Sequence, residues 1–230
     1  MRNGRTIHGA DFVGRGAAAR DRDAWHYLRL LVLIMIVFIG AAALLYPERF
    51  LLRSHPFSYL GGRQTPQGLR NLLSRLVYDG GMLLCALTMY LLARYYHRKH
   101  PVPVSHTYEL LSYLSALGYV FMVAPCDVES LRFPHSLGSG LVVGSHLFLT
   151  LFRLLALRHS LGTKLILVLL ALLLVPVLMY AGMWATGHPA QALYQKPAFA
   201  VIIILELYAA YQSRIHGEIR ILRYGGSFDI

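Results

Sequence analysis

The sequence predicts an all-α membrane protein, a bundle of six transmembrane helices with both termini in the cytoplasm. Only 14% of the 230 residues are charged, whereas a soluble domain has about 25%. Hydrophobic residues make up 56% of the chain and gather into long uncharged runs separated by basic connections. A disordered chain is excluded, because disorder requires low hydrophobicity together with high net charge.

Six segments reach or approach the roughly 20 apolar residues that cross a hydrocarbon core about 30 Å thick. We expect helices over residues 25–46, 72–96, 106–125, 135–157, 164–186 and 197–212. The first resembles a signal peptide, but its length and the five segments that follow favour a retained helix. The ionisable residues deep inside these segments are Arg75, Asp79, His146 and Glu206.

The Lys and Arg residues set the orientation, because cytoplasmic loops carry an excess of them. With a cytoplasmic N-terminus, about two thirds of the 22 Lys and Arg residues fall on the cytoplasmic side. Trp25, Tyr46 and Trp184 stand at segment ends, where aromatic residues meet the headgroups. We therefore expect a basic cytoplasmic tail over 1–24, the six-helix domain over 25–212 and a cytoplasmic extension over 213–230.

Small residues predict where the helices pack closely. Gly80, Gly81 and Gly118 allow close approach of the second and third segments to their neighbours. Gly140 and Gly144 form a GxxxG pair in the fourth segment. We expect this pair to place the fourth helix at the centre of the bundle, by packing within one monomer rather than between two.

Composition excludes several functional classes. The formal net charge is +11, but the basic residues stand between apolar runs and form no stripe that would suit nucleic acid. The two cysteines, Cys85 and Cys126, are too few for a disulfide framework or a Cys-based zinc module. We expect no cofactor and no nucleic-acid partner.

Ionisable groups inside a bilayer are costly and mark functional or paired sites. Asp79 follows Arg75 by four residues on one helix face, which suits either a local ion pair or a shared polar site. Glu206 lies deep in the sixth segment and must find a partner, take up a proton or face water. One hypothesis is therefore a proton-coupled transporter that uses Asp79 and Glu206.

The most concentrated polar stretch covers residues 125–146, at the third outer turn and the start of the fourth helix. We expect a neutral His135 hydrogen-bonded to Asp127. Three interpretations stay open: a turn that fixes the third helix against the fourth, a lipid or ligand pocket, and a hydrolytic site. In the hydrolytic site, Asp127 and His135 would be the catalytic residues or ligands of an unidentified metal, acting on a lipid ester or amide.

The first outer loop, residues 47–70, is the second distinctive segment. Its prolines and glycines exclude a long regular helix, and its apolar residues predict that it lies on the membrane surface or folds over the bundle. Arg53 and Arg63 suit bidentate binding of phosphate headgroups or of an acidic partner. The alternative is a solvated surface patch.

Four short motifs carry a family resemblance: H-P-F-S-Y-L-G-G at 55–62, Y-D-G-G-M-L-L at 78–84, P-C-D at 125–127 and F-P-H-S-L-G-S-G at 133–140. Together with Asn71 they resemble a large prokaryotic six-helix membrane family of unknown function. More distantly, they resemble the DRAM/Sfk-type proteins, whose eukaryotic branch is associated with lipid remodelling, lipid asymmetry and autophagy. The resemblance covers residues 26–212 and implies a lipid-related role in a prokaryotic inner (plasma) membrane. The matched positions are Ser58, Gly61, Asn71, Asp79, Asp127 and His135.

The leading functional hypothesis is a multi-pass inner-membrane protein that performs no chemistry. Its outer mouth would be formed by the first and third outer loops and shaped by Asp127 and His135. The partner would be a lipid headgroup, anionic in particular, a small amphiphile or another membrane protein. The predicted ligand-binding residues are Arg53, His55, Ser58, Arg63, Asp79 and Glu206.

Overall fold

The computed structural model describes residues 24–99 and 103–225, and this part of the chain is helical throughout apart from turns and loops. It contains seven α-helices, one short 3-10 helix and one isolated antiparallel bridge between Gln64 and Arg70. The all-α class is confirmed, and the predicted tail lies almost wholly outside the described residues. The elements are α2 (Ala24–Leu44), η1 (Phe57–Gly61), α3 (Leu72–Lys99), α4 (Pro103–Phe121), α5 (Glu129–Ala156), α6 (Arg158–Leu161), α7 (Thr163–Ala185) and α8 (Gln191–Gly225).

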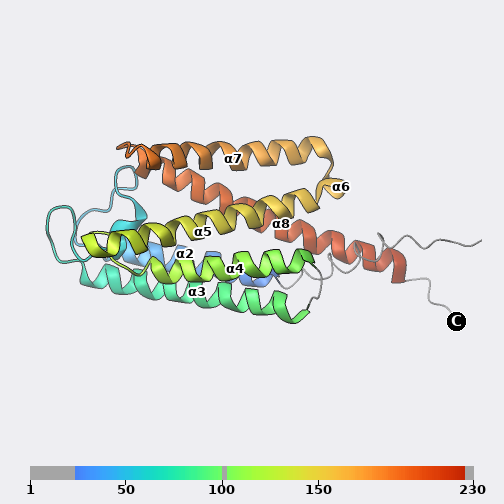
Figure 1. Cartoon of the computed structure of the whole chain (residues 1–230), viewed down its shortest axis with the longest axis horizontal. Coiled ribbons are helices and arrows are strands. Elements are labelled where there is room, and N and C mark those ends of the chain that lie inside the picture. Colours follow the sequence, from blue (N-terminus) through green and yellow to red (C-terminus); the bar gives the residue numbers. More distant parts are fainter. Residues whose placement is uncertain (1–23, 100–102, 226–230) are drawn as a thin grey trace, which may run out of the picture.

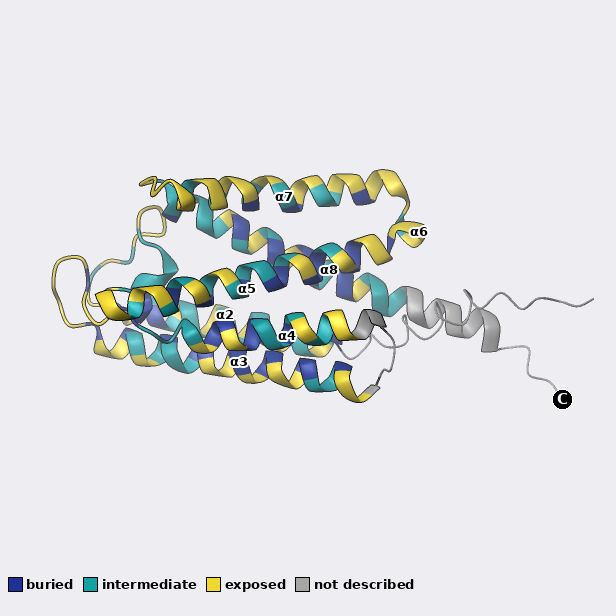
Figure 2. Ribbon diagram, viewed as in Figure 1, coloured by how far each residue is buried: buried dark blue, intermediate teal, exposed yellow. Residues whose placement is uncertain are grey.

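Five helices in the described part of the chain are long and apolar enough to cross a bilayer: α2, α3, α5, α7 and α8. They indicate a membrane protein that crosses the bilayer several times. The third predicted segment corresponds to α4, which has 19 residues and packs between α3 and α5. Large apolar side chains are exposed on the outer helices, for example Leu167 at 61% and Leu178 at 65% on α7 (Figure 2). Such apolar surface is expected where helices face lipid.

The ends of three helices differ from the predicted ones. Helix α5 begins at Glu129 rather than at 135, because a carboxylate in the first turn favours a helix start and Glu129 pairs with Arg132 at 3.1 Å. Helix α8 begins at Gln191 rather than at 197, contains Pro197 and ends at Gly225 rather than at 212. Helix α4 ends at Phe121 rather than at 125.

Five helices form a ring in the order α2, α3, α4, α5 and α8, and α7 packs outside it against α8 and α5. Figure 1 shows the long connections 45–71, 122–128 and 186–190 together at one end, which we call the loop end. Helix α2 begins and helix α8 ends toward the opposite end, which we call the terminus end. Helix α8 crosses the bundle obliquely (Figure 1).

Two glycine contacts bring helices together. A Cβ added at Gly81 would lie 2.5 Å from the Cβ of Phe38 on α2. Gly118 of α4 and Gly138 of α5 face each other, since a Cβ at Gly138 would lie 2.7 Å from the carbonyl oxygen of Gly118. The close approaches expected at Gly81 and Gly118 are thus confirmed.

The expected role of the GxxxG pair is wrong. A Cβ added at Gly140 or Gly144 would meet nothing within 4 Å. At about 100° per residue, Gly140 lies nearly opposite Gly138 on the helix, so the pair faces away from α4. The close contact of α5 with α4 is made by Gly138 instead.

Candidate functional site

Two polar side chains, the exposed Asp127 and the buried Asn71, hold the first loop at the loop end. Asp127 accepts hydrogen bonds from the backbone N–H of Arg63, at 3.0 and 2.9 Å, and of Gln64, at 2.9 Å. Asn71 is fully buried. Its Nδ2 donates to the backbone carbonyl oxygens of Tyr59, Leu60 and Gly62. The loop is therefore held over the end of the bundle, and both oxygens of Asp127 are occupied by main-chain donors.

The expected hydrogen bond between His135 and Asp127 is not formed. The Nδ1 atom of His135 lies 2.7 Å from the carbonyl oxygen of Ala124 instead. This difference arises because α5 begins six residues early, so that His135 lies in its second turn, facing the end of α4. His135 is 5% exposed, and its Nε2 atom is buried without a hydrogen-bond partner among the described residues.

A polar cavity of about 530 Å³ lies at the loop end, between the first loop, the start of α5 and the turn between α7 and α8. We call it the mouth cavity. Its polar lining includes Ser58, Arg132, His135, Ser136, Gln191 and Gln195. Cys126 also borders it and donates from Sγ to the carbonyl oxygen of Ser58 at 3.3 Å. Burial raises the pKa of the Cys126 thiol, which keeps the donating proton in place.

A second, mostly apolar cavity of about 470 Å³ adjoins the first. We call it the side cavity. Its long walls are Met35 to Gly40 of α2 and Gln195 to Ile203 of α8, and along α8 it extends for about 12 Å. Ser58, Ser139 and Gln195 line both cavities. A polar compartment and an apolar compartment therefore meet at these three residues.

A cation, Lys196, lines the side cavity and is the chain neighbour of Gln195. Nζ of Lys196 donates to the carbonyl oxygens of His55, at 2.6 Å, and Ala192, at 2.5 Å, and lies 5.3 Å from the centre of the Phe57 ring. Among the described residues no carboxylate lies within ion-pair distance of Lys196. An ammonium group has three donors, so one donor and the full charge are available to the side cavity that Lys196 lines.

Deeper in the bundle, Glu206 has the partners that the sequence did not reveal. Its Oε2 atom lies 2.7 Å from Nδ1 of His146, and its Oε1 atom accepts a hydrogen bond from Nη1 of Arg153 at 2.8 Å. The other guanidinium nitrogen of Arg153 donates to the Tyr96 hydroxyl at 2.8 Å. The side chains of Arg153, Glu206 and His146 are 0, 4 and 6% exposed. This buried cluster joins α3, α5 and α8.

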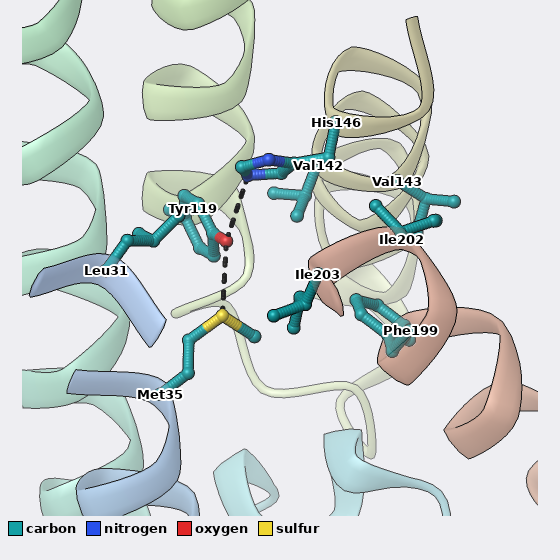
Figure 3. A pocket seen from close by; sticks show the side chains of 9 residues that line it. All are labelled: Leu31, Met35, Tyr119, Val142, Val143, His146, Phe199, Ile202 and Ile203. Atoms are coloured by element: carbon teal, nitrogen blue, oxygen red, sulfur yellow. Dashed lines mark hydrogen bonds between the residues drawn. The ribbon is translucent and has the colours of Figure 1, made fainter. Parts of the chain in front are cut away.

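The far nitrogen of His146 faces two hydroxyl groups. Its Nε2 atom lies 3.0 Å from Oγ of Ser115 and 3.2 Å from the hydroxyl oxygen of Tyr119. Figure 3 shows Tyr119 between His146 and Met35, whose sulfur lies 3.6 Å from the same hydroxyl. A neutral His146 that donates from Nδ1 to the Glu206 carboxylate accepts at Nε2 from these hydroxyl groups. Tyr119 also lines the side cavity, so the cluster borders its floor.

Asp79 and Glu206 are in separate places. Asp79 pairs with Arg75 at 3.3 Å, which is the local ion pair that the spacing allowed. Asp79 lies about two turns from the loop-end start of α3, whereas Glu206 lies about four turns from that of α8. Each carboxylate is neutralised by its own arginine. The described residues therefore contain no shared site for the two.

The remaining predicted residues have different surroundings. The side chains of Arg53 and Arg63 are exposed and line neither cavity. The ring of His55 packs among aromatic rings, at 5.5 Å from Phe50 and 5.7 Å from Tyr59. In the part of the chain that the structure describes, no group of three or more His, Cys, Asp and Glu residues is placed to hold a metal ion.

Comparison of the chain with protein-family models, with curated proteins and with solved structures finds no match. The resemblance to the six-helix family therefore stays a prediction from short motifs. Any function assigned to the chain must come from the cavities and the groups that line them.

Proposed function

We propose that the protein is a six-span prokaryotic inner-membrane protein that binds one phospholipid, with the headgroup in the mouth cavity and an acyl chain in the side cavity. In this topology α4 is the third span and the loop end faces outward, because most Lys and Arg residues then lie inside. The observation that carries the proposal is that the polar and apolar cavities meet at Ser58, Ser139 and Gln195. An amphiphile is likewise divided into a polar headgroup and an apolar chain.

The side cavity lies where α2 and α8 separate. The two helices touch toward the terminus end, where the rings of Trp25 and Tyr211 are 5.4 Å apart. The cavity residues on both helices lie nearer the loop end. An acyl chain can therefore pass sideways from the bilayer into the gap. Every phospholipid chain makes the same transfer from one apolar surrounding to another, so the chain does not distinguish one headgroup from another.

Selectivity between lipids must then come from the headgroup, and Lys196 supplies the group that recognises it. A phosphate oxygen accepts the free N–H of Lys196 in a charge-assisted hydrogen bond, in a site partly shielded from water. Arg132 borders the mouth cavity but is exposed and already paired with Glu129, so it adds little. The expected ligand class is a lipid that carries a phosphate.

Replacing Lys196 by Met should weaken phospholipid binding about tenfold or more, since a hydrogen bond to a charged group contributes about 1.5–3 kcal/mol. Binding is measured by native mass spectrometry of protein in detergent, titrated with phosphatidylglycerol and with diacylglycerol of the same chains. The wild type should prefer the phospholipid, K196M should lose that preference, and K196R should keep most of it.

The matched control is the double variant of Arg53 and Arg63 to Met, which removes two cations at the same end of the bundle that line neither cavity. Its lipid preference should equal that of the wild type. If this control loses the preference for phospholipid and K196M keeps it, the two exposed arginines bind the headgroup and the role of Lys196 is contradicted.

A further inference from the structure

His135, in the wall of the mouth cavity, has a buried ring nitrogen without a hydrogen-bond partner among the described residues. His135 lines this cavity, and its Nδ1 atom faces the carbonyl oxygen of Ala124 at 2.7 Å. A carbonyl oxygen only accepts, so Nδ1 carries the ring proton. Burial with no carboxylate partner among the described residues keeps the ring uncharged. Nε2 is then a lone-pair acceptor.

Orphaned acceptors of this kind are rare, because a buried polar group without a partner costs free energy. The Nε2 atom of His135 is buried and has no hydrogen-bond partner within the described residues. It belongs to a residue 5% exposed that forms part of a cavity wall. A bound molecule with an N–H or O–H group would satisfy it, whereas a molecule with acceptors alone would not.

His135 and Lys196 line two adjoining cavities, His135 the mouth cavity and Lys196 the side cavity. Ser139 lies one turn after His135 on the same face of α5 and lines both cavities. Gln195, the neighbour of Lys196, also lines both. A ligand whose phosphate meets Lys196 at the junction therefore has its headgroup in the compartment that His135 borders.

We infer that the bound phospholipid carries a hydrogen-bond donor beyond its phosphate, as ethanolamine and glycerol headgroups do, and that choline headgroups are rejected. This inference rests on the proposed function and specifies its ligand. A choline nitrogen has four carbon substituents and no N–H, so it would leave Nε2 of His135 unsatisfied. A site built around a polar group discriminates strongly against an analogue that lacks the complementary group.

Aromatic residues in the mouth cavity favour the opposite preference, for choline headgroups. Tyr59, Tyr180 and Trp184 also border the mouth cavity, and aromatic faces attract quaternary ammonium groups. If these rings governed recognition, each added methyl group would leave binding unchanged or strengthen it. The donor requirement of His135 predicts instead a sharp loss when the last N–H is removed.

The test is a headgroup series with fixed phosphate and fixed chains: ethanolamine, N-methylethanolamine, N,N-dimethylethanolamine and choline. Affinity for each lipid is measured by native mass spectrometry of the full chain in detergent. The first three lipids should bind similarly, because one N–H suffices, and choline lipid should bind about tenfold or more weakly. Equal or tighter binding of the choline lipid would overturn the inference and leave lipid binding intact.

His135→Asn assigns the effect to Nε2, because the Asn amide can still donate to Ala124 while no acceptor replaces Nε2. This variant should bind dimethylethanolamine and choline lipids equally. His188→Asn is the matched control, since His188 is exposed at the same end and lines neither cavity. Its selectivity should equal that of the wild type. If H135N still binds the choline lipid more weakly than the dimethylethanolamine lipid, as the wild type does, the inference is overturned. If H135N does not fold, the wild-type headgroup series is the test.

Two further results concern the proposed function rather than the inference. If the protein retains none of the four lipids, phospholipid binding fails and the headgroup inference fails with it. If soluble glycerophosphoethanolamine displaces the lipid at equal concentration, the acyl chain contributes nothing, and the ligand is a free phosphodiester instead of a lipid. We expect no displacement under these conditions.

Discussion

Replacing Arg153 by Met is expected to lower the free energy of unfolding by about 3–5 kcal/mol, the largest single effect that we predict. Arg153 is 1% exposed and neutralises Glu206, which is 3% exposed. Without the guanidinium, the carboxylate would stay in the bundle as a buried charge, and among the described residues only His146 would remain as its ionisable partner. Thermal unfolding of the protein in detergent, followed by circular dichroism, measures the loss.

The double variant R153M/E206Q separates a buried charge from lost packing. Removing both partners of a buried ion pair is often nearly neutral, whereas removing one is strongly destabilising. The double variant should therefore be more stable than R153M alone. If the two substitutions instead destabilise additively, the two side chains do not interact, and the cluster as described here is contradicted.

Gly138→Ala should destabilise the protein by about 1–3 kcal/mol through overpacking between α4 and α5. The new Cβ would lie 2.7 Å from the carbonyl oxygen of Gly118 and 2.9 Å from the backbone nitrogen of Met122. Backbone atoms cannot turn aside as a flexible side chain can, so α4 would have to shift. Unfolding in detergent, monitored as for Arg153, measures the effect.

Gly140→Ala is the matched control for this contact. It makes the same chemical change two residues later on the same helix, where an added Cβ meets nothing within 4 Å. Its stability should equal that of the wild type or exceed it by up to about 1 kcal/mol, because Ala favours helix over Gly. A loss as large as that of Gly138→Ala would show that the α4–α5 contact involves the opposite face.

Most of the fold could be predicted because it depends on local composition. Apolar runs of membrane length coincide with α2, α3 and α7 to within a few residues. The prediction failed where a polar stretch was helical. Glu129, Arg132 and Pro134 resemble a loop, but the first two pair within one helical turn. Whether Gly138 or Gly140 faces α4 depends on how the helix is rotated, and sequence spacing does not determine that rotation.

The candidate site was less predictable, because its contacts join distant residues. Glu206 meets Arg153 across 53 positions and His146 across 60. One signal was available, since His146 and Arg153 are seven residues apart and so lie on one face of a helix. The sequence shows Lys196 only as a basic residue beside the start of the sixth segment. The carboxyl group of Asp127 suggested a catalytic role. Its partners are backbone N–H groups, and the types of the neighbouring residues do not predict such contacts.

The guanidinium of Arg153 also interrupts the polar chain that leads from the floor of the side cavity toward Tyr96. Hydroxyl, imidazole and carboxylate groups can each pass a proton along, and Tyr119, His146 and Glu206 stand in that order. A guanidinium does not give up its proton in a protein. A proton that travels down from the cavity therefore stops at Glu206. Within the described part of the chain, ionisable groups therefore lie inside the bundle without forming a continuous proton path past Arg153.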